Sequence, residues 1–316
     1  MQAVYSKTIE KPCGFLFARW SAGAKAFELS LPPSKRVITD PYAPYYDGQV
    51  GMEMVRAMAL VNPSVRKAIV LRARFIDDYA REPLRSCFEQ VVLLGAGYDS
   101  RYLRIEDFHA ARVFELDLES TQTIKKALTR RLLGRLPANV TYVPIDFSKD
   151  SVTEKLIKAG FQCHKKTLFI WEGVTLFLNQ DIIAETLGKL KELGPNNRIT
   201  FDFVPTELVD DATDYQGNRQ LIQLCASIKE PLTFGCSPDR MRSILFGVGF
   251  SNIAITGMRE ASLMYSGSGN IEDSYYFATA ETGHASNGSG LILNSQNGDR
   301  SHADTIQIVS SYGGAS

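Results

Sequence analysis

Long apolar runs and a secretory signal are both missing from this 316-residue chain. No stretch reaches the roughly 18 apolar residues that a transmembrane helix needs, and no basic segment followed by an apolar one opens the sequence. We therefore expect no membrane partner. The five cysteines are scattered and none forms a C-x-x-C pair, which argues against disulfides and zinc knuckles and favours a reducing, cytoplasmic location.

An excess of charge of either sign is also missing. The 35 basic and 35 acidic side chains cancel, so we expect no broad nucleic-acid-binding surface and no nucleic-acid partner. No cluster of histidine, cysteine and aspartate has the spacing of a metal site, so we predict no metal. Hydrophobic residues make up 44% of the chain, which is enough to bury a full core.

Strand and helix patterns alternate through the middle of the chain, which is typical of βαβ units and a mostly parallel sheet with helices on both faces. A further helix and two strands are predicted near the end of this region, at 239–246, 251–256 and 274–280, and two helices precede it, at 52–61 and 64–80. The first five predicted strands are 90–94, 112–116, 140–145, 167–171 and 198–203, and the helices between them are 99–106, 119–136, 150–159 and 179–193.

Composition changes sharply at the carboxyl-terminal end. Residues 281–316 include six glycines, seven serines and three asparagines, which is typical of a flexible tail. We therefore expect three parts: a lead segment with a helical lid at 1–84, a core at 85–280 with an inserted lid around 206–230, and the tail.

A glycine turn follows the first predicted strand, at Gly95 and Gly97. Glycine allows a sharp turn and a close approach of the backbone to a ligand. A nicotinamide-binding fingerprint would have a third glycine where Ser100 stands. An ordinary strand–helix turn would also explain the two glycines, so this motif alone leaves the ligand open.

Acidic residues end the next three strands. Asp117 lies 20 residues after Gly97, where a ribose diol would be bound in a doubly wound sheet. Asp146 and Phe147 are suited to an adenine amino group and ring, although Asp146 could equally cap a helix. Glu172 emerges from an apolar run, so we expect a cationic partner beside it.

One candidate partner is Arg72. In the helix at 64–80 it shares the apolar stripe of Val65, Ile69 and Ile76, so its guanidinium faces the core and needs an anion. Arg74 lies about 200° around the helix, at roughly 100° per residue, and is expected on the surface.

With these segments together, residues 12–280 resemble the leucine carboxyl methyltransferase family of class I S-adenosylmethionine-dependent methyltransferases. The resemblance implies a Rossmann-like α/β fold with a seven-stranded sheet, its last strand antiparallel, and a helical lid. The segment Trp171-Glu172-Gly173 is more similar to bacterial and secondary-metabolite members than to those that methylate a phosphatase terminus. The segments that carry the resemblance are RARFIDD (72–78), LGAGYDSR (94–101), FELD (114–117), PIDF (144–147) and FIWEGVTLFL (169–178).

The resemblance also implies a cofactor, S-adenosylmethionine, and a role for each matching residue. Lys25 and Arg72 would hold its methionine carboxylate above the turn of Gly95 and Gly97. Asp117 would bind the ribose hydroxyls, Asp146 and Phe147 would contact adenine, and Glu172 would lie near the methionyl end.

The acceptor is the least constrained part of the prediction. A carboxylate is already ionised at pH 7, whereas a phenol with a pKa near 10 needs about 4 kcal/mol for ionisation, and no histidine is expected near the site. We expect O-methylation of a small molecule, with Glu172, Arg219 and Tyr215 as catalytic candidates and Asp202 as another possible base. The alternatives are methylation of a protein's C-terminal leucine, a nicotinamide oxidoreductase and a non-catalytic cofactor-binding protein; the oligomeric state is not predicted.

Overall fold

The computed structural model describes residues 15–61, 63–210, 219, 222–223, 225–226, 231–269, 271 and 274–283. Most of the predicted inserted lid and all but the first three residues of the predicted tail lie outside these residues. No described helix combines the length and apolarity that crossing a bilayer requires.

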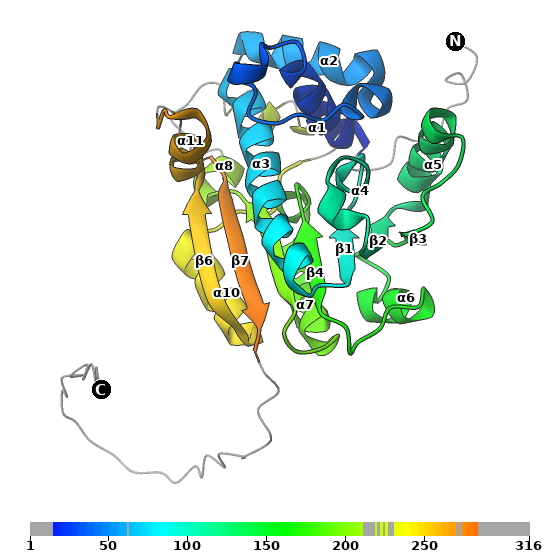
Figure 1. Cartoon of the computed structure of the whole chain (residues 1–316). Coiled ribbons are helices and arrows are strands. Elements are labelled where there is room, and N and C mark those ends of the chain that lie inside the picture. Colours follow the sequence, from blue (N-terminus) through cyan, green and yellow to red (C-terminus); the bar gives the residue numbers. More distant parts are fainter. Residues whose placement is uncertain are drawn as a thin grey trace, which may run out of the picture. The chain divides into compact units, whose positions relative to one another are not determined.

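The sheet has seven strands in the order β3-β2-β1-β4-β5-β7-β6 (Figure 1). Strands β1 to β5 pair in parallel, and β7 is antiparallel to both of its neighbours. This confirms the predicted fold class. The strands are β1 (Gln90–Leu94), β2 (Arg112–Asp117), β3 (Val140–Pro144), β4 (Thr167–Trp171), β5 (Arg198–Phe203), β6 (Phe250–Gly257) and β7 (Tyr276–Thr282).

Helices cover both faces of the sheet because the strand residues alternate between them. Val92 and Leu94 of β1 pack with α6, α7 and α10, whereas Val91 and Leu93 pack with α3 and α4. The described helices are α1 (Phe15–Glu28), α2 (Ala43–Val61), α3 (Pro63–Ser86), α4 (Arg101–Arg104), α5 (Glu119–Leu133), α6 (Val152–Lys158), α7 (Gln180–Glu192), α8 (Thr206–Val209), α10 (Pro238–Val248) and α11 (Met258–Ser266).

Local signals set several of these helix ends. Asn179 accepts a hydrogen bond from the Ile182 backbone N–H at 2.9 Å and so caps α7, and Ser237 caps α10 just before a proline. Gly134 and Gly249 adopt left-handed conformations at the carboxyl ends of α5 and α10.

Helices α1 and α11 were not predicted. Trp20, Ala22 and Ala24 are all buried, so α1 has no broad polar face to show a helical period. A Cβ on Gly23 would collide with the backbone of Gly51 on α2, so the two helices touch there directly. Glycine at this position allows that close approach.

The ends of other elements differ from their predictions. Helix α2 begins at Ala43 rather than at 52, and α4 is a single turn rather than 99–106. Helix α3 continues past Pro83, where Leu84 packs with the buried Ile76 and Ala80 and so offsets the missing backbone N–H of the proline.

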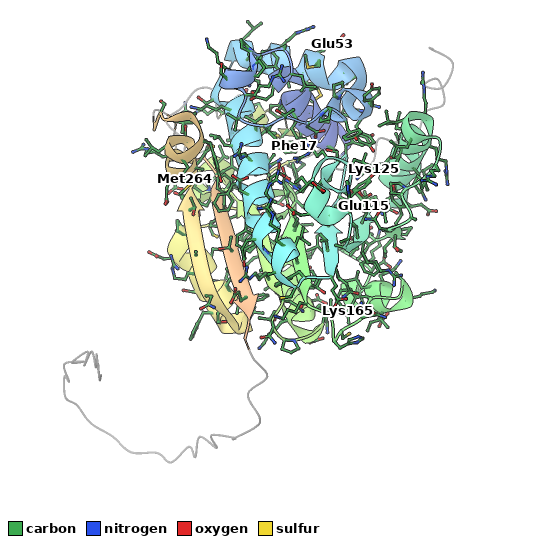
Figure 2. All side chains as sticks on the ribbon, in the orientation of Figure 1. Phe17, Glu53, Glu115, Lys125, Lys165 and Met264 are labelled. Carbon is green, nitrogen blue, oxygen red and sulfur yellow. The ribbon has the colours of Figure 1, made fainter. Side chains whose placement is uncertain are left out.

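A buried ion pair joins α5 to the sheet. Lys125 Nζ lies 2.6 Å from Glu115 Oε1 on β2, and both side chains are almost fully buried (both are labelled in Figure 2). Such a pair is costly to break, because removing one partner leaves the other charge buried alone.

Candidate active site

A cavity of about 560 Å³ lies at the carboxyl ends of the parallel strands. Open α/β sheets bind their ligands at this edge, because the loops that leave the strands gather there. The cavity is lined by the segments 93–99, 117–118, 145–148, 172–174 and 177–179 that follow β1, β2, β3 and β4, and by Phe17, Ala18, Ser21 and Lys25 of α1.

The glycine turn forms the floor of this cavity. Gly95 has φ +66° and Gly97 has φ +44°, a region that residues with a Cβ rarely adopt. A Cβ on Gly95 would also collide with Cγ2 of Val174. Position 95 therefore requires glycine for two reasons: the turn needs a positive φ, and the loop after β4 leaves no space for a Cβ.

The carboxylate of Asp117 faces this turn. Its oxygens accept hydrogen bonds from the backbone N–H of Gly97 at 2.6 Å and of Leu118 at 2.7 Å. Burial raises the pKa of Asp117, and these two N–H groups oppose that rise. The Thr121 side chain is a further hydrogen-bond partner that lowers this pKa. A carboxylate has about four acceptor positions, so these three donors do not exhaust its capacity for a hydroxyl group.

Asp146 and Phe147 line the next part of the cavity. Hydrogen bonds from Lys149 and Ser148 lower the pKa of Asp146 to about 2, so it is ionised at neutral pH. The Phe147 ring lies 6.1 Å from that of Trp171, measured between centroids. Both residues that the sequence analysis assigned to adenine therefore line the cavity, on the segment that follows β3.

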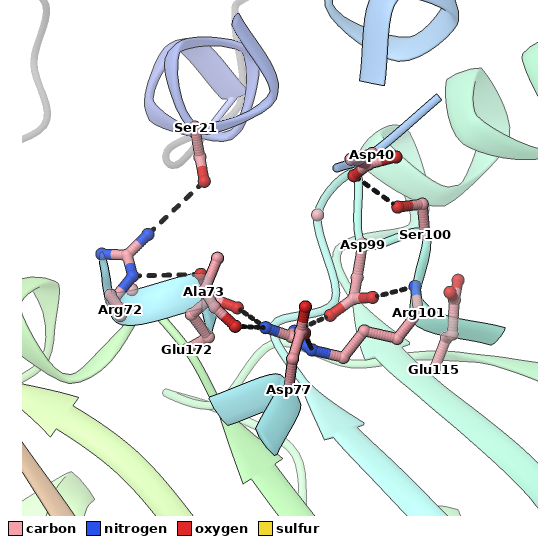
Figure 3. A network of polar contacts seen from close by, with 12 residues as sticks. Ser21, Asp40, Arg72, Ala73, Asp77, Asp99, Ser100, Arg101, Glu115 and Glu172 are labelled. Atoms are coloured by element: carbon pink, nitrogen blue, oxygen red, sulfur yellow. Dashed lines mark hydrogen bonds and ion pairs between the residues drawn. The ribbon is translucent and has the colours of Figure 1, made fainter. Parts of the chain in front are cut away.

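A buried network of charges includes the cavity residues Arg72 and Glu172 (Figure 3). Glu172 Oε1 accepts a hydrogen bond from Nε of Arg72 at 3.0 Å, which confirms the predicted cationic partner. Glu172 Oε2 lies 2.6 Å from Nη2 of Arg101. Burial alone would raise the pKa of Glu172, but Arg101 and Arg72 outweigh it and hold the pKa well below its usual value, so Glu172 is a poor base.

The helical phase of the two arginines is also confirmed. The Arg72 side chain is 2% exposed, whereas that of Arg74 is 42% exposed and pairs with Asp78 at 2.9 Å on the same helix. Lys25 also lines the cavity, buried on α1 with its Nζ 3.7 Å from Asp40 Oδ2.

Arg101 is a site residue that the sequence analysis missed. It is 1% exposed and contacts Asp77, Asp99 and Glu172, so it ties the loop after β1 to α3 and to the end of β4. A signal was present in the sequence, because Arg101 ends the LGAGYDSR segment that follows the first predicted strand.

The acceptor-side candidates are less defined. Arg219 is exposed and is not among the described residues that line the cavity, and Tyr215 lies outside the described residues. Their catalytic roles stay predictions.

Comparisons with known proteins relate this chain to methyltransferases. A family model described as leucine carboxyl methyltransferase matches residues 18–191. A relative from Frankia alni, named for S-adenosyl-L-methionine-dependent methyltransferase activity, is 31% identical over 65% of this chain and 75% of its own length. A similarly named Bacillus subtilis protein is 26% identical over 51% of this chain, which spans only about half (53%) of that relative.

Solved structures support the same fold. A Thermobifida fusca protein described as a methyltransferase has a TM-score of 0.59 at 10% identity, covering 88% of this chain and 97% of its own. A Streptomyces avermitilis protein of the DUF574 family has a TM-score of 0.56 at 13% identity, covering 83% of this chain and 96% of its own.

Proposed function

Because the chain belongs to the leucine carboxyl methyltransferase family and is an S-adenosylmethionine-dependent methyltransferase, we propose that it methylates an oxygen atom of a small molecule. The oxygen belongs to a carboxylate or a hydroxyl group. The observation that supports this most is the cavity itself, where each cofactor-binding residue expected from sequence lies on one lining.

The residues present fit the cofactor. The backbone turn at Gly95 and Gly97 lines the cavity, and Asp117 keeps acceptor capacity for a ribose diol. Lys25 and Arg72 provide cations for a methionine carboxylate, and Phe147 provides a flat apolar surface for adenine.

Bound S-adenosylmethionine supplies a methyl group on a positively charged sulfur, which an acceptor oxygen displaces in line. The protein's contribution is to align the two reactants and exclude water, and such positioning lowers a barrier by up to about 7–11 kcal/mol. Phe17 of α1 and Phe177 after β4 meet edge to face, with 5.0 Å between ring centroids, and form an apolar wall of the cavity.

A small acceptor is favoured by the size of this site. A cavity of about 560 Å³ is within the ordinary range for small-molecule sites, and it is shared here with the cofactor. None of the described residues that line it is a histidine, and the low pKa of Glu172 makes that carboxylate a poor base. A carboxylate acceptor needs no base, so we favour it over a neutral hydroxyl.

The test is transfer of a labelled methyl group to a set of small carboxylic acids and phenols. Methyl esters release methanol in base and methyl ethers do not, so the product identifies the acceptor oxygen. Label in protein instead would favour methylation of a C-terminal leucine. Cofactor binding with no transfer to any fraction of a source extract would favour a non-catalytic binding protein, and binding of NADH in its place would overturn the cofactor assignment.

A further inference from the structure

The guanidinium of Arg72 is held by groups from three separate elements. Besides the bond to Glu172 after β4, Nη1 lies 3.4 Å from Asp202 Oδ2 on β5, and Nη2 donates to Ser21 Oγ on α1 at 3.4 Å. Asp202 is completely buried, and burial raises its pKa to about 6 in spite of Arg72. A carboxylate in this place is costly, so it needs a structural or functional reason.

Gly173 lies directly against this guanidinium and also contacts Asp202. Its backbone N–H donates to Asp202 Oδ1 at 2.6 Å, so one carboxylate joins the loop after β4 to Arg72. A Cβ on Gly173, which has φ +70°, would lie 3.0 Å from Nη2 and 3.1 Å from Nη1 of Arg72. The glycine therefore leaves the space that the flat guanidinium occupies.

The backbone of Asp202 is held by a further hydrogen bond. The hydroxyl of Thr175 donates to the Asp202 backbone carbonyl at 2.5 Å, which ties β5 to the loop that carries Gly173. Buried charges thus alternate in a chain from Arg101 through Glu172 and Arg72 to Asp202. An arginine with two buried carboxylate neighbours has little freedom to swing.

We propose that Asp202 and Gly173 are positioning residues, which hold the Arg72 guanidinium at the edge of the cavity where it meets the aminocarboxylate of the cofactor. The inference rests on the proposed function, since that is where Arg72 is given this ligand. It explains why a cation meant for a carboxylate is already paired, because the two acids set the direction of its guanidinium.

The experiment compares two ligands in isothermal titration calorimetry. S-adenosylhomocysteine has the aminocarboxylate, and 5′-methylthioadenosine lacks it but keeps the adenine and ribose. Asp202→Asn keeps the shape and the acceptor for Gly173, but turns an N–H group toward Arg72. We expect affinity for S-adenosylhomocysteine to fall about tenfold or more, the value of a charged hydrogen bond, and affinity for 5′-methylthioadenosine to stay within about twofold.

A matched control is Asp78→Asn, which removes the acid from a half-exposed aspartate–arginine pair on α3 away from the cavity. It should change neither affinity. Gly173→Ala provides a second variant that disturbs the same guanidinium without changing any charge, and it should show the same selective loss.

The outcomes distinguish a failure of the proposed function from a failure of the positioning inference. If Arg72→Lys weakens both ligands equally or neither, then the role of Arg72 in the proposed function is wrong. If Arg72→Lys is selective but both Asp202→Asn and Gly173→Ala are not, the positioning inference alone is overturned. A gain in S-adenosylhomocysteine affinity in Asp202→Asn would also overturn it, because it would show that Asp202 opposes the ligand through its charge.

Discussion

Replacing Asp117 by alanine tests the cofactor site most directly. The carboxylate accepts hydrogen bonds from the backbone N–H groups of Gly97 and Leu118, and it lines the cavity with acceptor capacity remaining. Losing the charge-assisted bonds to a ribose diol should cost about 1.5–3 kcal/mol, which is about ten- to hundredfold in the dissociation constant of S-adenosylmethionine.

The same change has a second, separable cost. The backbone N–H of Gly97 in the glycine turn and that of Leu118 after β2 lose their acceptor, which should lower the free energy of unfolding by about 1–3 kcal/mol. Calorimetry with S-adenosylmethionine and denaturant unfolding of the free protein measure the two effects independently. Asp181→Ala, in an exposed first turn of α7, is the control for loss of an acid elsewhere.

Unchanged S-adenosylmethionine affinity in a folded Asp117→Ala protein would refute the reasoning and remove Asp117 from the binding site. A loss of stability with no loss of affinity would mean that the carboxylate serves only the turn.

Four further predictions follow from the structure. Lys125→Met should lower the free energy of unfolding by about 3–5 kcal/mol in denaturant titration, because it leaves the buried Glu115 carboxylate of β2 without its cationic partner. Because the pKa of Glu172 is depressed in the folded state, its ionised form stabilises the fold at any pH above the unfolded-state pKa near 4.5. The difference in free energy of unfolding between wild type and Glu172→Gln should therefore be at its maximum at pH 7 and shrink only as the pH falls below about 4.5. Arg72→Lys should weaken S-adenosylmethionine binding through loss of the two-pronged guanidinium, whereas Arg74→Lys, in a half-exposed pair, should leave the dissociation constant unchanged. Deleting 284–316 should leave the melting temperature and cofactor affinity nearly unchanged, because that composition cannot order itself; a large drop in either would show that the tail docks.

The cut in that last experiment differs from the boundary that composition alone indicates. Strand β7 extends to Thr282, whose hydroxyl oxygen accepts a hydrogen bond from the Asn197 backbone N–H at 2.9 Å. Truncation after Ala280 would therefore damage the sheet. Composition changes near residue 281, but hydrogen-bond pairing decides where the strand ends.

The sequence alone was enough to predict features that depend on neighbouring residues in the chain. Buried parallel strands appear as short apolar runs, and the glycine turn and the acids that end β2, β3 and β4 follow directly after them. Since the carboxyl ends of parallel strands share one edge, a one-dimensional pattern was enough to bring Gly95, Asp117 and Glu172 to one cavity. The phase of a long amphipathic helix likewise separated Arg72 from Arg74.

Only the tertiary structure showed the roles of Lys25, Arg101 and Asp202, whose surroundings come from distant elements. Helix α1 is buried on most sides and has no period to reveal it, so the depth of Lys25 in the cavity depended on packing. Arg101 and Asp202 show their roles only through Glu172 and Arg72, which lie far from them in the chain. Periodicity records which side of an element is buried, but the pairing of buried charges is set by where the elements meet.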